Sequence, residues 1–502
     1  MSTTTETPDL NYGLDDRPKP FPKALALGLQ HVLTMFGATI AVPLILSPAL
    51  GFDTTQIAIL ISSVFIASGL ATLLQLTVGS RLPIVQGVSF AFLGPFFAII
   101  AAHEGTIAMR YIAGGIIFGA VVEAVVGYSG LFGRIRRYIS PVVIGPVIAL
   151  IGLSLFGAAV GQVNSVFSPE GELLQTGNWW LAWLVVIGVF LFSLVLAERI
   201  RLVAIFPILL AVLVAYLVAL LFSEVGVITE NSRAYVSLTT IRDSVGAAPW
   251  VRNVIGDRAI FFPWGLPLLD FGFIVALLAA YLASMIESFG DYHAVARVAG
   301  AGEPTRKMIN RGIGSEGLGC LTTGLVGGFA STSYTENIGL IGLTKVASRY
   351  VVAIGAISLI VLGFVTKIGA VIATIPPPIV GGVYMALFGL IAAVGLSNLL
   401  RADMSSQRNL LIAGFILFMG LVIPNYIGSV PDDWTVLGLS WLTNLTRSIG
   451  GSGIAVAAVL GLVLDNLIPG TDAERGITQE AEAASTEASE LPDDTTPKDP
   501  QG

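Results

Sequence analysis

The chain has 502 residues, of which 54% are hydrophobic and only 12% charged, with a net charge of −7. A soluble globular chain carries about a quarter charged residues, so the composition excludes an ordinary soluble protein. Three histidines and the single cysteine, Cys320, exclude a His-rich metal cluster and an internal disulfide. The sequence also lacks the phosphate-binding loop of an ATP-driven pump. We therefore expect a membrane protein embedded in a lipid bilayer, with no metal, no cofactor and no nucleic-acid partner.

The two ends of the chain differ from the rest in composition. Residues 1–20 are polar, and residues 471–502 hold nine acidic and two basic side chains. Such segments cannot bury enough apolar surface to fold, so we predict two disordered tails. The first apolar run begins near Phe21 and is too long for a signal peptide.

Apolar runs long enough to cross a hydrocarbon core about 30 Å thick follow one another between the tails. Nineteen of the 26 Lys and Arg residues lie in inside segments if the N-terminus is inside, which predicts cytoplasmic termini in a plasma-membrane protein. Residues 223–265 form the longest predicted outside loop. The fourteen predicted spans are 22–46, 56–77, 83–101, 111–129, 139–161, 178–197, 202–222, 269–293, 312–329, 334–348, 350–366, 375–396, 409–427 and 452–468.

A repeat relates the fifth and twelfth spans. The run from Pro141 to Leu153 aligns with the run from Pro378 to Leu390 at a constant offset of 237. The two runs are seven spans apart, an odd number, so they must be inverted relative to each other in the membrane. Inverted repeats are typical of secondary transporters, whose binding site lies at the repeat interface.

Two spans are poor continuous helices. The third has Gly and Pro near its middle, and the first half of the tenth is polar. Irregular backbone at membrane depth requires hydrogen-bond partners from protein or a cavity. Both segments are third in their half of the chain, and interrupted segments in matching places predict a substrate site.

Three acids are predicted in the same region. Glu287 and Asp291 lie four residues apart in the eighth span and share one helix face, and Glu336 lies beside Asn337 in the tenth. Acids within a bilayer usually face the bundle interior and serve function, although Asp291 could instead be solvated at a helix end. Two neighbouring acids also offer a place to hold a proton.

These acids and helix starts suit the binding of a flat heterocycle with adjacent N–H and C=O groups. A carboxylate accepts from a ring N–H, and N–H groups at a helix start donate to ring carbonyls. Phe90 or Phe92 could cover the ring face, although aromatic residues at this spacing are also common in ordinary packing.

The tenth span resembles the signature of the nucleobase–ascorbate transporter family, which includes the xanthine and uracil permeases. Glu336 is followed by Asn337 and Gly339, and after four variable residues by Thr344 and Lys345. The similarity covers about residues 20–470. Three further family motifs occur in the expected order: Gly28-Leu-Gln30-His31, Gln86-Gly-Val-Ser89-Phe90-Ala-Phe92 and Glu287-Ser-Phe-Gly-Asp291-Tyr.

The resemblance implies an all-α fold of two inverted seven-span repeats with interrupted half-helices in the third and tenth spans. It also implies a homodimer in which a core domain moves against a gate domain. The implied division is 1–20 N-terminal tail, 21–130 core, 131–222 gate, 223–265 extracellular loop, 266–367 core, 368–470 gate and 471–502 C-terminal tail.

The resemblance also implies roles for individual residues. Glu287 is similar to the family's key substrate carboxylate, and Glu316 to a ninth-span acid linked to coupling. His31 is similar to a first-span histidine that orients the site. The implied substrate-binding residues are Glu287, Glu336, Phe90, Ser89, Ala38, Thr335 and Asp291, and the implied coupling or site-shaping residues are Glu287, His31, Asn337 and Glu316.

The motifs disagree about the substrate. Asp291 is similar to the xanthine and urate branch, whereas Glu336 is similar to the uracil branch and to plant members of broad range. Vertebrate ascorbate carriers have Pro at the latter place. We expect symport of xanthine or uric acid, with uracil second, driven by protons or otherwise by sodium.

Two other functions were compared with this expectation. An anion exchanger or channel of the related sulfate or bicarbonate type would place neutral or basic groups at its site, which Glu287 and Glu336 oppose. A membrane enzyme would need a nucleophile–base pair or metal cluster, and His293 near Asp291 lacks a third member.

Overall fold

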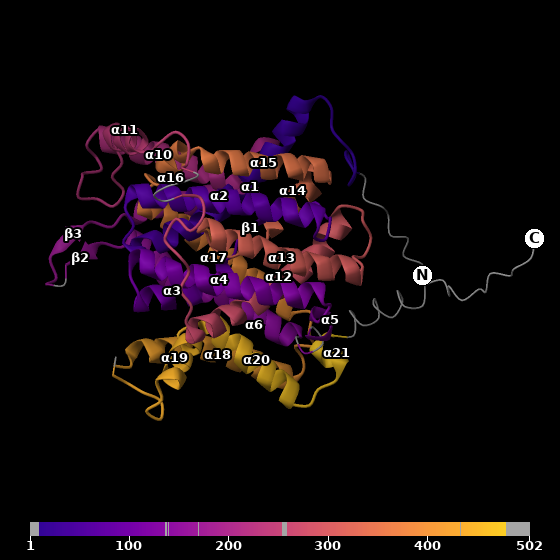
Figure 1. Ribbon diagram of the computed structural model, residues 1–502. Helices are drawn as coiled ribbons and strands as arrows, with labels where there is room; N and C mark the ends of the chain where they lie inside the picture. The colour runs from indigo at the N-terminus through magenta and orange to yellow at the C-terminus, as the bar shows by residue number, and fades with distance from the viewer. Residues whose placement is uncertain are drawn as a thin grey trace, which may run out of the picture.

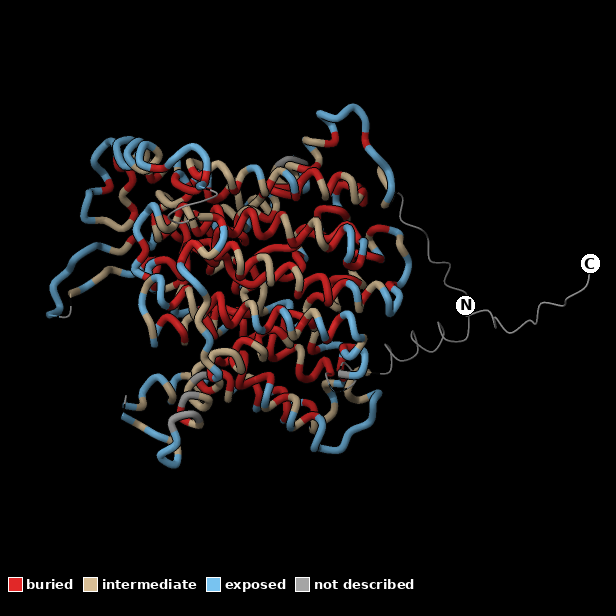
Figure 2. The backbone as a smooth tube through the Cα atoms, in the orientation of Figure 1, coloured by how far each residue is buried: buried red, intermediate tan, exposed pale blue. Residues whose placement is uncertain are grey.

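The structure is a computed structural model that describes residues 10–477 except 136, 137, 139, 169, 254–258 and 432. Most described residues are helical, and the long helices lie side by side (Figure 1). Buried residues concentrate in the middle of this bundle and exposed residues in the connecting segments (Figure 2). The elements in chain order are α1 (Phe21–Leu50), α2 (Thr54–Thr77), β1 (Gln86–Val88), η1 (Phe90–Phe92), α3 (Leu93–Ala102), α4 (Gly105–Tyr128), α5 (Phe132–Ile135), α6 (Pro141–Ser154), α7 (Phe156–Val163), β2 (Val166–Phe167), β3 (Leu173–Gln175), α8 (Trp179–Phe190), η3 (Leu191–Leu196), α9 (Arg201–Ile205), α10 (Pro207–Glu224), α11 (Leu238–Ala247), α12 (Phe271–Val298), α13 (Arg306–Val326), β4 (Ser331–Ser333), α14 (Thr335–Thr344), α15 (Arg349–Phe364), α16 (Thr366–Ile372), α17 (Pro377–Leu399), α18 (Gln407–Ser429), α19 (Ser440–Gly450), α20 (Gly453–Leu467) and α21 (Asp472–Arg475).

A helix overlaps each of the fourteen ranges expected to span the membrane. Within the described part of the chain, nine helices are long and apolar enough to cross a bilayer, or ten if α15 and α16, bent by 82°, form one span. The α14 helix is only ten residues long, and α13 carries several charges. The structure therefore shows a multi-pass helical membrane protein, and the number fourteen stays a prediction.

The helices pack in two groups. In the first, α2 packs against α13 and α15, α4 packs against α13, and α1 packs against α15. In the second, α17 packs against α6, α7 and α8, while α18 and α20 pack against each other and against α6. Small residues permit close approach in the first group, since a Cβ on Gly317 of α13 would lie 2.4 Å from the Ala124 backbone nitrogen of α4.

The two segments of the predicted repeat contact each other directly. A Cβ on Gly145 of α6 would meet Leu399 of α17, and a Cβ on Gly152 would lie 2.2 Å from the Phe388 carbonyl oxygen. The residue numbers of these contacts increase along α6 and decrease along α17, so the two helices run antiparallel. This is the orientation that an inverted repeat requires, and the repeat itself stays a prediction.

Residues 10–20 differ from the prediction of a disordered tail. The Asn11 N–H donates to the Lys345 carbonyl at 2.8 Å, and the Ala347 N–H donates to the Tyr12 carbonyl at 2.8 Å. Arg349 also forms an ion pair with Asp15. Backbone pairing of this kind does not depend on apolar side chains, so a hydrophobicity argument overlooks it. Residues 1–9 lie outside the described residues.

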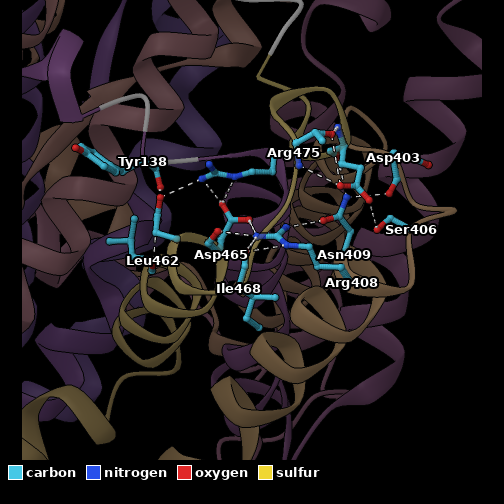
Figure 3. Close-up of polar contacts among 12 residues, drawn as sticks. Tyr138, Asp403, Ser406, Arg408, Asn409, Leu462, Asp465, Ile468 and Arg475 are labelled. Carbon is cyan, nitrogen blue, oxygen red and sulfur yellow. Dashed lines mark hydrogen bonds and ion pairs between the residues drawn. The ribbon is translucent and has the colours of Figure 1, made fainter.

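The predicted C-terminal tail is partly ordered as well. Residues 471–477 include α21, which is joined to the start of α18 and the end of α20 by polar contacts (Figure 3). Asp465, 1% exposed, forms ion pairs with Arg408 at 3.0 Å and with Arg475 at 2.8 Å. The Thr471 backbone N–H, and then the Ser406 hydroxyl, hold the pKa of Glu474 below its usual range. Residues 478–502 of the predicted acidic tail lie outside the described residues.

Candidate functional site

The two interrupted spans meet through a pair of short strands. β1 and β4 are antiparallel, with Gln86 opposite Ser333 and Val88 opposite Ser331. The Ser89 N–H donates to the Ala330 carbonyl at 2.9 Å, which extends the pairing beyond the two strands. Backbone groups in the middle of the bundle are thus satisfied by each other, as a membrane interior requires.

Each strand leads directly into a helix that begins in the bundle interior. Ser89 precedes η1 and α3, and its buried hydroxyl accepts from the Ala91 N–H at 3.3 Å. Tyr334 precedes α14, whose first turn contains Thr335 and Glu336. The first N–H groups of a helix have no partner within it and carry partial positive charge. Two helix starts therefore present donors to the same region, as the interrupted segments predicted.

Asp291 of α12 bonds to the start of the tenth segment. Its Oδ2 atom accepts from the Ser333 hydroxyl at 2.6 Å, and its Oδ1 atom accepts from the Thr335 hydroxyl at 2.9 Å. Asp291 is 6% exposed, so the alternative of a solvated acid at a helix end is wrong. With both oxygens bonded to protein hydroxyls, Asp291 positions the start of α14.

Glu287 lies one turn before Asp291 on α12 and has a different environment. Its side chain is half-buried, and its electrostatic neighbours are Asp291, Glu316 and Glu336. Within the described part of the chain, the Glu287 carboxylate accepts no hydrogen bond. Glu336 is half-buried as well. These two acids thus keep oxygen atoms available for a ligand between the helix starts.

His31 and Asn337 form a buried contact between α1 and α14. The Asn337 amide donates to the His31 carbonyl at 3.0 Å and lies 3.1 Å from His31 Nδ1. Nearby, the Tyr334 hydroxyl donates to the Val88 carbonyl at 3.0 Å. His31 is therefore buried against the start of α14, where it bonds to Asn337.

The other residues expected at the site lie on α1 and on the third segment. Ala38 is buried on α1. The ring of Phe90 is half-buried and contacts Phe388 of α17 edge to face, with 5.8 Å between ring centres. Phe92 is fully buried and packs edge to face on Tyr281, so it serves packing rather than contact with a ligand.

Glu316 lies behind the site, on α13. It is 1% exposed and accepts from the hydroxyls of Ser284 at 2.9 Å and Tyr292 at 3.1 Å. Ser284 and Tyr292 belong to the same helix as Glu287 and Asp291. Glu316 is thus connected to Glu287 and Asp291 through α12.

Two buried polar side chains in this region were not predicted to belong to the site. Gln86 of β1 and Glu123 of α4 are both 0% exposed, and their side-chain oxygens have no hydrogen-bond partner within the described part of the chain. Gln86 belongs to the family motif in the third span, but the resemblance implied no role for it. Glu123 could have been predicted, because an acid within a predicted span is a functional candidate.

A small apolar hollow lies between α1, α10 and α17. Its walls include Phe36 and Ile40 of α1 and Val383 and Tyr384 of α17, and they contain none of the predicted site residues. Its lining offers no carboxylate, so it does not serve the recognition of a polar ring.

Comparison with known proteins identifies the family. Residues 22–429 match a family described as a permease family. Solute carrier family 23 member 2 of Homo sapiens is 37% identical over 93% of this chain and 76% of its own length. The chain belongs to the nucleobase–ascorbate transporter family. Nucleobase-ascorbate transporter 12 of Arabidopsis thaliana is 31% identical to this transporter, over 93% of this chain and 71% of its own. The protein is accordingly a transporter and not an enzyme.

Solved structures of other transporters share the fold. The transmembrane domain of a cyanobacterium bicarbonate transporter, BicA, aligns with 84% of this chain and all of its own at a TM-score of 0.53 and 13% identity. Murine Slc26a9, an anion transporter in the inward-facing state, aligns with 90% of this chain and 69% of its own at a TM-score of 0.58 and 9% identity. At these identities the likeness concerns the fold.

Proposed function

We propose that this transporter imports a nucleobase by symport with a cation, in the first place a proton and otherwise sodium. The observation that carries the proposal is the pair Glu287 and Glu336, two half-buried acids where two helix starts meet. The Glu287 carboxylate accepts from a ring N–H, and N–H groups at the helix starts donate to ring carbonyls. The ring of Phe90 covers one face of the heterocycle.

The proposed substrate is xanthine or uric acid, with uracil second. Asp291 supports the former and Glu336 the latter, through the family branches that each resembles. The bonds from Asp291 to Ser333 and Thr335 make it a positioning residue, so it acts on selectivity by setting where α14 begins. Glu336 itself faces the ligand.

The proposed transport cycle moves a core domain, spans 1–4 and 8–11, against a gate domain, spans 5–7 and 12–14. The two groups of packed helices support this division. The Phe90–Phe388 contact and the hydrogen bond from the Tyr384 hydroxyl to the Ala41 carbonyl, 2.8 Å, cross between the groups. We further propose a homodimer in the plasma membrane with both termini in the cytoplasm.

Anion exchange is the alternative function that the similarity of fold suggests. The comparison structures carry the names of bicarbonate and anion transporters. The site argues against it here, because bicarbonate and sulfate have no ring N–H groups that could donate to Glu287 and Glu336.

The test is uptake of labelled xanthine and uracil into proteoliposomes with an imposed inward proton gradient. We expect the gradient to drive accumulation of one base in the wild-type protein. Glu287→Gln should abolish accumulation while leaving thermal stability unchanged, because the amide oxygen is a weaker acceptor and the side chain no longer carries a proton. Glu172→Gln, in the exposed β2–β3 connection, is the matched control and should behave as wild type.

Wild-type accumulation by Glu287→Gln would contradict the assignment of the site. Accumulation that follows a sodium gradient and ignores the proton gradient would replace the proton with sodium. Bicarbonate or sulfate exchange without uptake of either base would favour the anion-carrier alternative.

A further inference from the structure

Glu123 lies in the last third of α4, and its side chain is enclosed by the bundle. It is 0% exposed, and both of its carboxylate oxygens lack a hydrogen-bond partner within the described residues. Burial of an unpartnered carboxylate is strongly unfavourable, and buried polar groups are almost always bonded. The side chain therefore needs something that the protein itself does not supply.

The nearest acid to this unpartnered carboxylate is Glu316. Close packing of α4 and α13 brings the two together, because a Cβ on Gly317 would lie 2.7 Å from the Ala120 carbonyl and 2.4 Å from the Ala124 nitrogen. Glu316 is the electrostatic neighbour of Glu123. The other titratable groups that face Glu123 are Cys320, from α13, and Tyr281 and Tyr292, from α12. Glu316 also has Glu287 and Asp291 of α12 as electrostatic neighbours.

The surroundings of the pair favour a proton over a metal ion. Hard cations such as Mg²⁺ and Ca²⁺ take about six or more oxygen ligands. Both Glu316 oxygens already accept from hydroxyls, those of Ser284 and Tyr292, so only the two Glu123 oxygens are without a hydrogen-bond partner in the pair. A single proton on the pair removes one of two facing charges and gives Glu123 a hydrogen to donate.

We propose that Glu123 and Glu316 form a second cation site, a carboxyl pair that binds one proton between α4 and α13. The pair is distinct from Glu287 and Glu336, which hold the ligand. It is connected to them through α12, whose Ser284 bonds Glu316 and whose Ser288 lies 2.9 Å from the Ser333 hydroxyl. Loss of the proton changes the charge behind the start of α14, where Ser333 also donates to Asp291.

Proton binding is measured directly by infrared spectroscopy of the purified full-length protein in lipid nanodiscs. The wild-type protein should show the C=O band of a buried protonated carboxyl, and the band should disappear at high pH. Glu123→Gln should remove this band. Glu104→Gln, an exposed acid at the start of the same helix, is the control and should retain it.

Coupling is measured in proteoliposomes. Glu123→Gln should lose accumulation driven by a proton gradient, yet retain exchange of labelled for unlabelled base, because exchange requires no net movement of protons. The expected loss of accumulation rests on the proposed proton symport, whereas the expected infrared band does not. Loss of the band without loss of accumulation would overturn the coupling role and leave the symport proposal intact.

Two further outcomes would overturn the proton site itself. One is an unchanged band in Glu123→Gln. The other is sodium-dependent stabilisation of the wild-type protein that Glu123→Gln abolishes, which would make the pair a sodium site. If Glu123→Gln does not fold, Tyr292→Phe replaces it: this variant keeps both acids, removes one donor to Glu316 and should shift the pH at which the band disappears. An unshifted titration would then refute the proposal.

Discussion

Acids in the bundle interior differ in what their oxygens bond, and this separates their roles. Asp291 accepts from Ser333 and Thr335, and Glu316 accepts from Ser284 and Tyr292. Glu287 and Glu123 accept no hydrogen bond within the described part of the chain, but the first is half-buried and the second fully buried. An accessible free carboxylate can bind a ligand as well as a proton, whereas an inaccessible one can be neutralised by a proton but cannot reach a ligand.

Asp291→Asn should weaken substrate affinity without abolishing transport. The amide retains one oxygen acceptor, so one of the bonds from Ser333 and Thr335 is lost and the start of α14 is displaced. A hydrogen bond to a charged group contributes about 1.5–3 kcal/mol, so we expect KM to rise roughly tenfold to a hundredfold. The measurement is the concentration dependence of uptake. Asp270→Asn, at the N-terminal start of α12, is the control, and equal KM values in the two variants would contradict the positioning role.

Sequence reasoning at this scale identified acids but not their partners. The rule that an acid within a span is functional identified Glu287, Asp291 and Glu336, and motif resemblance added Glu316. The same rule applies to Glu123 and Asp465, which the prediction did not include. That Asp291 is bonded to hydroxyls and Glu287 is not depends on tertiary contacts, which no spacing encodes.

Among the elements, the interrupted spans were the most predictable feature. Glycine, proline and polar residues in two apolar runs indicated broken helices, and each run contains a strand followed by a helix. The strand pairing itself was not predicted. Strands of three residues are too short to show an alternating pattern, so their register is visible only in the fold.

The antiparallel contact of α6 and α17 predicts unequal effects for two nearby glycines. In Gly152→Ala the new Cβ would lie 2.2 Å from the Phe388 carbonyl oxygen, so the backbones must separate, at a cost of about 1–3 kcal/mol. In Gly157→Ala the Cβ meets nothing within 4 Å, and helix propensity favours alanine by up to about 1 kcal/mol. Thermal unfolding in detergent should show a loss for the first variant only. Equal stability would contradict the close packing.

At the scale of the whole molecule, composition predicted the multi-pass helical fold, but it misjudged the ends. Residues 11–14 pair with the backbone between α14 and α15, and residues 471–475 pack against the start of α18 and the end of α20. Both segments are polar and are ordered by hydrogen bonds and ion pairs rather than by apolar burial. Composition measures only apolar burial, so it assigned them to disordered tails.

The ion pairs at the end of the chain should matter for stability. Asp465→Asn removes the charge that lies between Arg408 and Arg475, whereas Asp472→Asn alters an exposed acid on α21. Removing one partner of a buried ion pair typically costs about 3–5 kcal/mol, so the first variant should unfold at a clearly lower temperature and the second should not. Thermal unfolding of the detergent-solubilised protein measures this difference. Wild-type stability of Asp465→Asn would show that the ion pairs contribute nothing.

The pairing of β1 with β4 has a consequence for inhibitors. The hydrogen bonds between Gln86–Val88 and Ser331–Ser333 join the two helix starts, so their spacing is the same whichever side of the membrane has access. A competitive inhibitor shaped to that spacing should therefore have the same order of preference among related compounds from outside and from inside. Pharmacology from the two faces would then differ in potency and rate, but not in which compound is favoured.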